Sequence, residues 1–200
     1  MNLAVKGHVR ALMDGPTRVL VKAGITADHL TALGCLLSVA AAVVLAVGRY
    51  AWAAGLLLGS GLCDMLDGAV ARAGKGETRR GAFMDSVLDR VGESALYVGS
   101  AWRGLALVRA VAGSRWEVTL PLLALASSLL VSYARARAQG LGAECRVGLM
   151  ERSERMVLQI AGLVIAIYWE PAWAWALGLL TLLNGVTFLQ RIVHVRGILK

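Results

Sequence analysis

Charged residues are scarce in this sequence. They make up 17% of its 200 residues, whereas about 25% is usual in a soluble domain. Apolar residues take their place: 58% of the chain is hydrophobic, and its mean hydropathy is +0.64. A soluble domain of this length lacks the interior volume to bury so much apolar surface, and a disordered chain needs low hydrophobicity. The composition therefore predicts an integral membrane protein, with residues 1–200 forming a single domain.

Cysteine and histidine are also sparse, and neither is clustered. The three cysteines, Cys35, Cys63 and Cys145, are an odd number without C-x-x-C or Cys/His spacing. That pattern favours neither a disulfide framework nor a zinc site. The three histidines are equally scattered, so no His-based metal site or catalytic triad is expected.

Six stretches are long and apolar enough to span a bilayer, which takes about 20 residues per helix. They cover residues 28–48, 51–72, 82–105, 118–138, 154–170 and 172–190. The segment before them, residues 1–24, alternates apolar and basic positions, as an interfacial amphipathic helix does. We therefore predict an all-α polytopic membrane protein, in which an interfacial helix precedes a six-helix bundle over residues 28–190.

Basic residues exceed acidic ones, giving a net charge of +8. In a soluble protein this charge would suggest nucleic acid binding, but six spans leave no domain for it. On the expected topology, 16 Lys and Arg lie on the side of both termini, and only Arg49, Arg103, Arg109 and Arg115 lie on the other. The positive-inside rule then places both termini in the cytoplasm, with the protein in the cell membrane.

Four acidic residues fall where a spanning helix should avoid them. Asp64 and Asp67 share one helix face, and Asp85 and Asp89 share a face of the next helix. Because the connection between the two helices is short, we expect antiparallel neighbours with both pairs at a similar depth, near the cytoplasmic end. Uncompensated carboxylates are costly in a membrane. Divalent cations would compensate them, and four carboxylates suit two Mg²⁺ ions, or Mn²⁺.

The surroundings of these acids point to phosphate chemistry. Gly68 and Ala71 leave room beside the first Asp pair, and Arg72 can hold phosphate oxygens in a bidentate fork. A two-metal site with such an Arg is typical of phosphoryl transfer. The alternative is a proton relay or a buried ion-pair network that includes Arg72 and Arg90, as in a transporter or channel. Glu93, one turn beyond Asp89, fits either a supporting role or an ion pair within the bundle.

The acids also belong to a longer pattern, D-x2-D-G-x2-A-R-x8-G-x3-D-x3-D, which runs from Asp64 to Asp89. It resembles the motif of the CDP-alcohol phosphotransferase family. The resemblance implies a membrane enzyme that transfers a substituted phosphate from a CDP-linked lipid to an alcohol and releases CMP. It implies that Asp64, Asp67 and Asp85 are metal ligands. Asp89 would ligate the second metal ion and act as general base on the acceptor hydroxyl.

The same resemblance implies a binding site for the CDP-lipid donor and a homodimer, which the small-residue helix faces permit. The residues implied for the donor are Asp28, His29, Leu30, Thr31, Gly68, Arg72 and Thr78. Asp28 is also a suitable helix N-cap, and the two roles are compatible.

A second basic cluster suggests that the acceptor alcohol carries a phosphate. It comprises Arg135, Arg137, Arg152, Arg155 and Arg191. Arg suits bidentate phosphate recognition, although each of these residues could also be an ordinary positive-inside anchor. The segments SYARARA and ERSER resemble the phosphatidylinositol phosphate synthase branch of the family. That resemblance implies that these residues and Ser132 bind inositol 1-phosphate.

One difference from the phosphatidylinositol phosphate synthase pattern leaves a second acceptor as an alternative. The phosphatidylinositol phosphate synthase branch often has Lys where this chain has Arg135, and the two side chains are not equivalent in a tight phosphate site. Glycerol 3-phosphate, the acceptor of the phosphatidylglycerophosphate branch, is therefore the alternative. An archaetidyl donor lipid remains an alternative to a diacyl one.

Overall fold

The computed structural model of the protein describes residues 15–74, 78–111 and 115–199, without the side chains of 108–111. The described residues are helical or irregular and contain no strand, which confirms the predicted all-α class. A helical segment over residues 15–22 comes first. Six long helices follow: α2 (Ala27–Ala46), α3 (Tyr50–Ala73), α4 (Arg79–Val111), α5 (Trp116–Gly140), α6 (Arg152–Ala166) and α7 (Pro171–Ile198).

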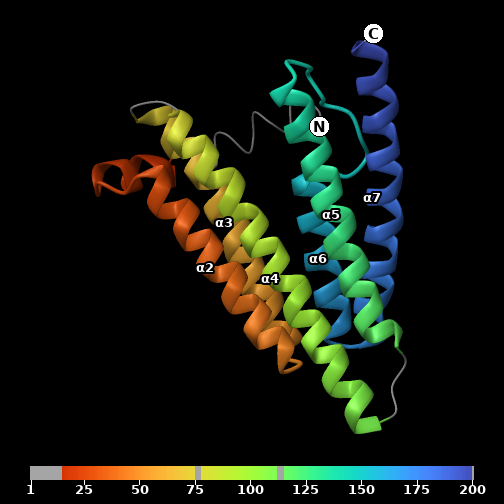
Figure 1. The fold of residues 1–200 in the computed structure, drawn as a ribbon. Helices are drawn as coiled ribbons and strands as arrows, with labels where there is room; N and C mark the ends of the chain where they lie inside the picture. Colours follow the sequence, from red (N-terminus) through yellow and green to blue (C-terminus); the bar gives the residue numbers. More distant parts are fainter. Residues whose placement is uncertain (1–14, 75–77, 112–114, 200) are drawn as a thin grey trace.

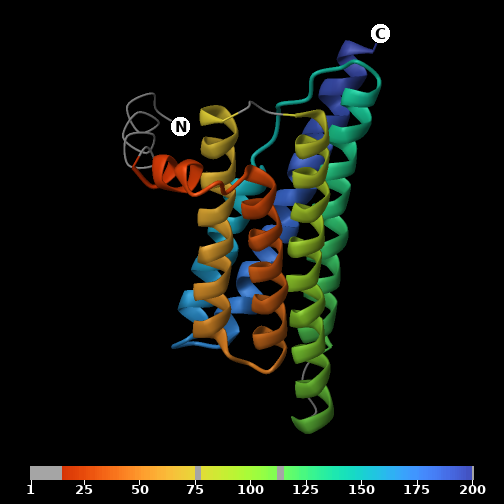
Figure 2. The same cartoon turned by 90° about the vertical axis from the view of Figure 1, so that its left-hand side faces the viewer.

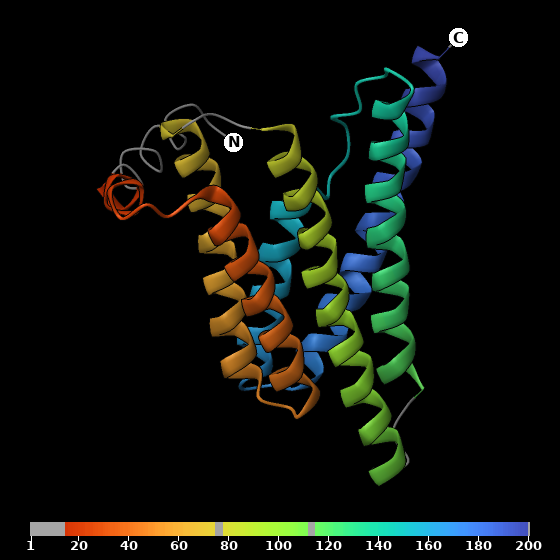
Figure 3. The same ribbon diagram turned by 60° about the vertical axis from the view of Figure 1, so that its left-hand side comes forward.

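The helices form two groups that run roughly along one axis (Figures 1 and 3). Helix α2 packs against both α3 and α4, and lies between them in Figure 2. Helix α7 packs against α5 and α6, while contacts of α4 with α5 and of α3 with α6 join the two groups. Over their described residues, α3 and α4 are antiparallel, as expected, but their backbones do not approach each other closely. The acidic halves of the two helices therefore meet through their side chains rather than through close backbone contact.

Small residues let α2 approach both of its neighbours. At Gly34, an added Cβ would lie 3.3 Å from Cys63 Cβ on α3. At Gly99 on α4, an added Cβ would collide with the backbone carbonyl of Ala42. Ser38 of α2 and Ser60 of α3 are buried and hydrogen-bonded to each other at 2.8 Å. Close contacts between small residues are a common way to pack helices in membranes.

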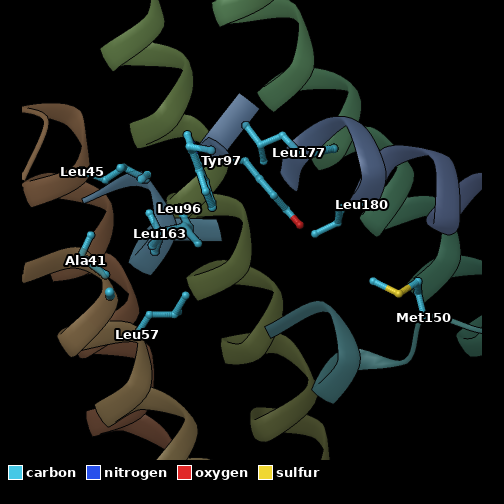
Figure 4. Close-up of a cluster of buried hydrophobic side chains, with 14 residues drawn as sticks. Ala41, Leu45, Leu57, Leu96, Tyr97, Met150, Leu163, Leu177 and Leu180 are labelled. Atoms are coloured by element: carbon cyan, nitrogen blue, oxygen red, sulfur yellow. The ribbon is translucent and has the colours of Figure 1, made fainter. Parts of the chain in front are cut away.

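A hydrophobic core lies where the two helix groups meet (Figure 4). Leu45 and Leu96 come from the first group, while Leu163 and Leu177 come from the second, and all four are at most 2% exposed. Many other large apolar side chains are exposed, including Leu36 and Trp52. In a membrane protein, such side chains face lipid.

Within the described residues, four helices are long and apolar enough to cross a membrane: α2, α3, α5 and α7. The predicted spans over residues 82–105 and 154–170 lie on α4 and α6, which are not among them. The first half of α4 carries several charges. Helix α6 has 15 residues, or about 22 Å at 1.5 Å per residue, against a hydrocarbon core of about 30 Å.

At the end of the bundle away from the acids, one cluster ties three segments together. Tyr50 donates a hydrogen bond to Glu170 Oε1 at 2.9 Å, and Arg103 Nη2 donates to the same oxygen at 3.0 Å. Although burial favours the neutral acid, these two hydrogen bonds outweigh it and hold the pKa of Glu170 below its ordinary value. The turn before α7 is thereby attached to α3 and α4.

The predicted interfacial helix over residues 1–24 lies largely outside the described part of the chain. Of its described residues, 15–22 are helical and lie crosswise to α2 at the end of the bundle where α3 ends and α4 begins (Figure 2). Most of these side chains are exposed, and Thr17 is buried.

Candidate active site

Three of the four predicted acids meet at the space between α3 and α4. One carboxylate oxygen from each of Asp64, Asp67 and Asp85 lies within 4.8 Å of the other two. Asp67 is only 8% exposed, and its Oδ2 accepts a hydrogen bond from Thr31 Oγ1 on α2 at 2.8 Å. Asp85 Oδ1 is buried without a hydrogen-bond partner among the described residues.

The fourth acid, Asp89, joins the cluster through an arginine. Arg152, the first residue of α6, forms ion pairs with Asp64 and with Asp89, and its Nη2 lies 2.5 Å from Asp89 Oδ1. Arg90 Nη1 lies 3.6 Å from the other oxygen of Asp89. The Asp89 side chain is only 10% exposed. Three helices therefore contribute charged groups to one site.

The three converging acids suit a divalent cation. Their ligand atoms are all carboxylate oxygens, which Mg²⁺ and Mn²⁺ prefer. The buried Asp85 Oδ1 has no hydrogen bond to a described residue, and a buried polar atom of this kind requires a partner that accounts for it. Asp64, Asp67 and Asp85 could therefore hold a metal ion.

Asp67 and Asp85 also line a groove of about 610 Å³, together with residues from the start of α2 and the end of α3. Four of the residues predicted to bind the donor line it, namely Asp28, Thr31, Gly68 and Thr78. Thr78 Oγ1 accepts a hydrogen bond from the backbone nitrogen of Gly81 at 3.0 Å. The groove therefore combines acidic walls with open backbone at the end of α3.

The other three predicted donor residues do not line this groove. Arg72 folds back against Gly68, where its Nη1 would lie 3.2 Å from an added Cβ. His29 instead completes a capping box with Thr26 at the start of α2. Leu30 is 6% exposed and belongs to the core.

The structure divides the predicted acceptor residues into two groups. Arg155 and Arg191 are each 2% exposed. Arg155 forms an ion pair with Glu93, and Arg191 donates to the carbonyls of Val131 (2.6 Å) and Val147 (3.0 Å).

The remaining acceptor residues are more accessible. Ser132, Arg135 and Arg152 are half-buried, and Arg137 is exposed. Within the described chain, neither Arg135 nor Arg137 forms an ion pair with an acid. Arg135 and Arg155 are both close enough to Arg191 for their charges to repel it.

A buried polar network supports this side of the site, and the sequence did not reveal most of it. Arg155 Nε and Nη2 donate to the two oxygens of Glu93 at 2.7 and 2.8 Å. Tyr97 donates to Glu93 at 3.2 Å, and Gln159 Nε2 donates to Tyr97 Oη at 2.7 Å. The position of Glu93 one turn after Asp89 hinted at its role, but no spacing linked it to α6.

A small cavity of about 30 Å³ separates the acids from this network. Its lining includes Asp64, Asp89, Arg152 and Gln159. A single water molecule requires about 10–15 Å³ of such volume. The cavity can therefore hold water beside Asp64 and Asp89.

Comparison with known proteins identifies the class. The family model for CDP-alcohol phosphatidyltransferase matches residues 24–189. The chain is 39% identical over 176 residues to the archaetidylinositol phosphate synthase of Methanothermobacter thermautotrophicus, covering 87% of this chain and 85% of that protein. It is 35% identical over 180 residues to the phosphatidylinositol phosphate synthase of Mycobacteroides abscessus, covering 88% and 80%.

The fold agrees with solved structures. The phosphatidylinositol phosphate synthase of Mycobacterium tuberculosis with CDP-DAG bound superposes with a TM-score of 0.82 at 32% identity, covering 92% of this chain and 94% of that one. The same enzyme in complex with manganese and citrate gives the same TM-score and identity. The chain therefore belongs to the CDP-alcohol phosphatidyltransferase family and is an enzyme of that class, as the motif indicated.

Proposed function

We propose that this enzyme makes a phospholipid headgroup by transferring a lipid-phosphate group from a CDP-linked lipid to the hydroxyl of inositol 1-phosphate, releasing CMP. The observation that carries the proposal is the meeting of Asp64, Asp67 and Asp85 beside a groove of about 610 Å³. The relatives named above support it, because their names specify inositol phosphate products.

The groove is the proposed donor site. Backbone at Gly68 and the side chains of Asp28, Thr31 and Thr78 would hold the CDP moiety there, while Arg72 beside Gly68 would bind phosphate oxygens. His29 and Leu30 would act by fixing the start of α2, as their capping and core contacts indicate. The acyl or isoprenoid chains would lie along the apolar exterior.

Asp89 is the proposed general base. Its carboxylate lies in the same site as the other acids and can take the proton from the attacking hydroxyl. Asp64, Asp67 and Asp85 would hold one Mg²⁺ or Mn²⁺ ion, and Asp89 would contribute to a second. When bound, such ions neutralise the charge that develops on the pyrophosphate as CMP leaves.

The acceptor is proposed to bind between α5 and α6. Ser132, Arg135, Arg137 and Arg152 would donate to its phosphate, since they are the accessible members of the cluster. Arg155 and Arg191 would lie fixed behind it, held by Glu93 and by the carbonyls of Val131 and Val147. Glycerol 3-phosphate is the alternative acceptor, because it offers the same phosphate to the same arginines.

The proposal includes the membrane topology and the oligomeric state of the enzyme. All six helices would span the membrane as one domain, with both termini and the active site facing the cytoplasm, and the protein would act as a homodimer. The acids of α4 would be accommodated because they face the polar site, while exposed apolar side chains such as Phe83 on α4 and Val157 on α6 would face lipid.

Release of CMP from purified protein tests the reaction. CDP-lipid would be offered with inositol 1-phosphate, glycerol 3-phosphate, free inositol or serine, and the labelled headgroup traced into lipid. We expect inositol 1-phosphate to give the fastest product formation. Faster transfer to glycerol 3-phosphate would establish the alternative, while transfer to free inositol would contradict a phosphate-binding acceptor site.

A substitution separates the chemistry from the binding. Asp89→Asn should slow CMP release by about 100-fold or more, because general bases contribute that much. Glu144→Gln, which removes an exposed carboxylate in the α5–α6 connection, is the matched control and should retain normal turnover. Normal turnover in Asp89→Asn would exclude Asp89 as the base.

A further inference from the structure

Arg152 has an unusual position for a residue expected to bind a substrate phosphate. Its guanidinium bridges carboxylates of two different helices, Asp64 on α3 and Asp89 on α4. Within the described chain these two acids are its only hydrogen-bond and ion-pair partners. The Arg152 side chain is 27% exposed, whereas that of Arg155, one turn further along α6, is 3% exposed.

The two arginines therefore form two unequal ion-pair contacts. The inner contact joins Arg155 to Glu93, and the outer contact joins Arg152 to Asp64 and Asp89. In the inner contact, the Arg155 side chain is 3% exposed and that of Glu93 is 14% exposed, and a further hydrogen bond from Tyr97 completes the pair. Removing one partner of such a pair leaves an uncompensated charge, so the inner contact stays formed. In the outer contact, the side chains of Arg152 and Asp64 are 27% and 35% exposed, while Asp89 is 10% exposed. Water can therefore reach the guanidinium on the Asp64 side, where an exchange of partners is less costly. The inner contact thus holds α6 in place, while the Arg152 side chain can move away from Asp64 and Asp89.

The carboxylates that Arg152 bridges are also proposed metal ligands. A divalent cation between Asp64 and Asp89 would meet the guanidinium at the same oxygens, and two cations a few ångströms apart repel each other strongly in a site of low dielectric constant. We propose that Arg152 is an internal counter-cation that competes with the metal ion for Asp64 and Asp89. Loading of the metal would displace the guanidinium.

The displaced side chain would then be available to the acceptor. This step rests on the proposed function, in which the acceptor carries a phosphate beside α6. Binding of the metal would make Arg152 free to donate to that phosphate, and binding of the phosphate would withdraw Arg152 from the acids. By thermodynamic linkage, each ligand would strengthen binding of the other. The enzyme would thereby avoid holding a phosphate substrate beside unneutralised carboxylates.

The affinity for Mn²⁺ measures this competition without any turnover. Purified full-length protein in detergent would be titrated with Mn²⁺, and the free ion followed by electron paramagnetic resonance. We expect Arg152→Gln to bind the weaker Mn²⁺ ion about tenfold more tightly than the wild type, within the range of typical coupling energies. Arg152→Lys keeps the charge but cannot bridge both acids, so it should show a smaller gain in affinity.

A charge control and a ligand control make the outcome decisive. Arg79→Gln removes an equal charge from the exposed start of α4 and should leave the Mn²⁺ affinity within about twofold of the wild type, as expected for a screened surface charge. Unchanged affinity in both Arg152 variants, or an equal gain in Arg79→Gln, would overturn the competition. If the wild type binds no Mn²⁺, or if Asp64→Asn binds it as tightly as the wild type does, the metal site itself fails, and the competition with it.

Discussion

Glu93, whose side chain is 14% exposed, matters although it lies outside the reacting groups. It lies on α4, one turn from Asp89, and neutralises Arg155 through two hydrogen bonds at 2.7 and 2.8 Å. A further hydrogen bond, from Tyr97, leads into a polar network that reaches Gln159 on α6. The motif that carries the chemistry therefore depends on a partner residue that lies beyond it in the sequence.

We predict that Glu93→Gln destabilises the protein by about 3–5 kcal/mol, the usual result of breaking a buried ion pair. The variant leaves the guanidinium of Arg155 buried without a counter-charge. The measurement is thermal or denaturant unfolding in one detergent. Glu170→Gln is the matched control, because Glu170 pairs with Arg103 at an exposed position, and such pairs contribute about 0–1 kcal/mol. Equal losses in the two variants would contradict the assigned role of Glu93.

Pairs of helices determine the width of the active site. Helices α3 and α4 hold the acids but do not pack closely on each other over their described residues, and α2 packs against both. The contact of Gly99 with the Ala42 carbonyl fixes how closely α2 approaches α4. The distance between the two acid-bearing helices therefore depends on small residues far from the acids.

We predict that Gly99→Ala destabilises the protein by about 1–3 kcal/mol, because its added Cβ would collide with the Ala42 carbonyl and overpack the contact. Unfolding midpoints and CMP release would be measured together, and both should fall. Gly55→Ala on α3 provides the control, since an added Cβ there meets nothing within 4 Å. That variant should be neutral or gain up to about 1 kcal/mol from helix propensity. A stable, active Gly99→Ala protein would mean that this contact is adaptable.

The sequence predicted where the helices lie along the chain better than it predicted which side chains of different helices contact each other. The span expected at 28–48 is close to α2 (Ala27–Ala46), because an apolar run identifies such a helix directly. Helix α4 begins at Arg79 rather than residue 82, since hydropathy ignores a charged first turn. Asp64 and Asp67 could be placed on one face from their spacing alone. The bridge from Arg152 could not, because it depends on where α6 packs.

The distribution of charge over the complete bundle gives the last prediction. By the helix bounds, Arg49, Arg103 and Arg115 lie near the ends of α2 and α4, while Arg72 and Arg152 lie at the end of α3 and the start of α6. These two sets of helix ends are at opposite ends of the bundle (Figure 1). The net charge of +8 thus divides into a small and a large group along the bundle axis. If the larger group faces the cytoplasm, the turn between α6 and α7 must face outward.

Labelling of introduced cysteines tests this orientation. Tyr168 is 89% exposed in the α6–α7 turn, and Gly197 is exposed near the end of α7. A membrane-impermeant maleimide should modify Tyr168→Cys in intact spheroplasts, but should reach Gly197→Cys only after permeabilisation. The wild-type protein gives the baseline, because Cys63 and Cys145 are buried and Cys35 is half-buried. The reverse labelling pattern would place the acids and their arginines on the outer side, away from any cytoplasmic supply of nucleotide-linked lipid.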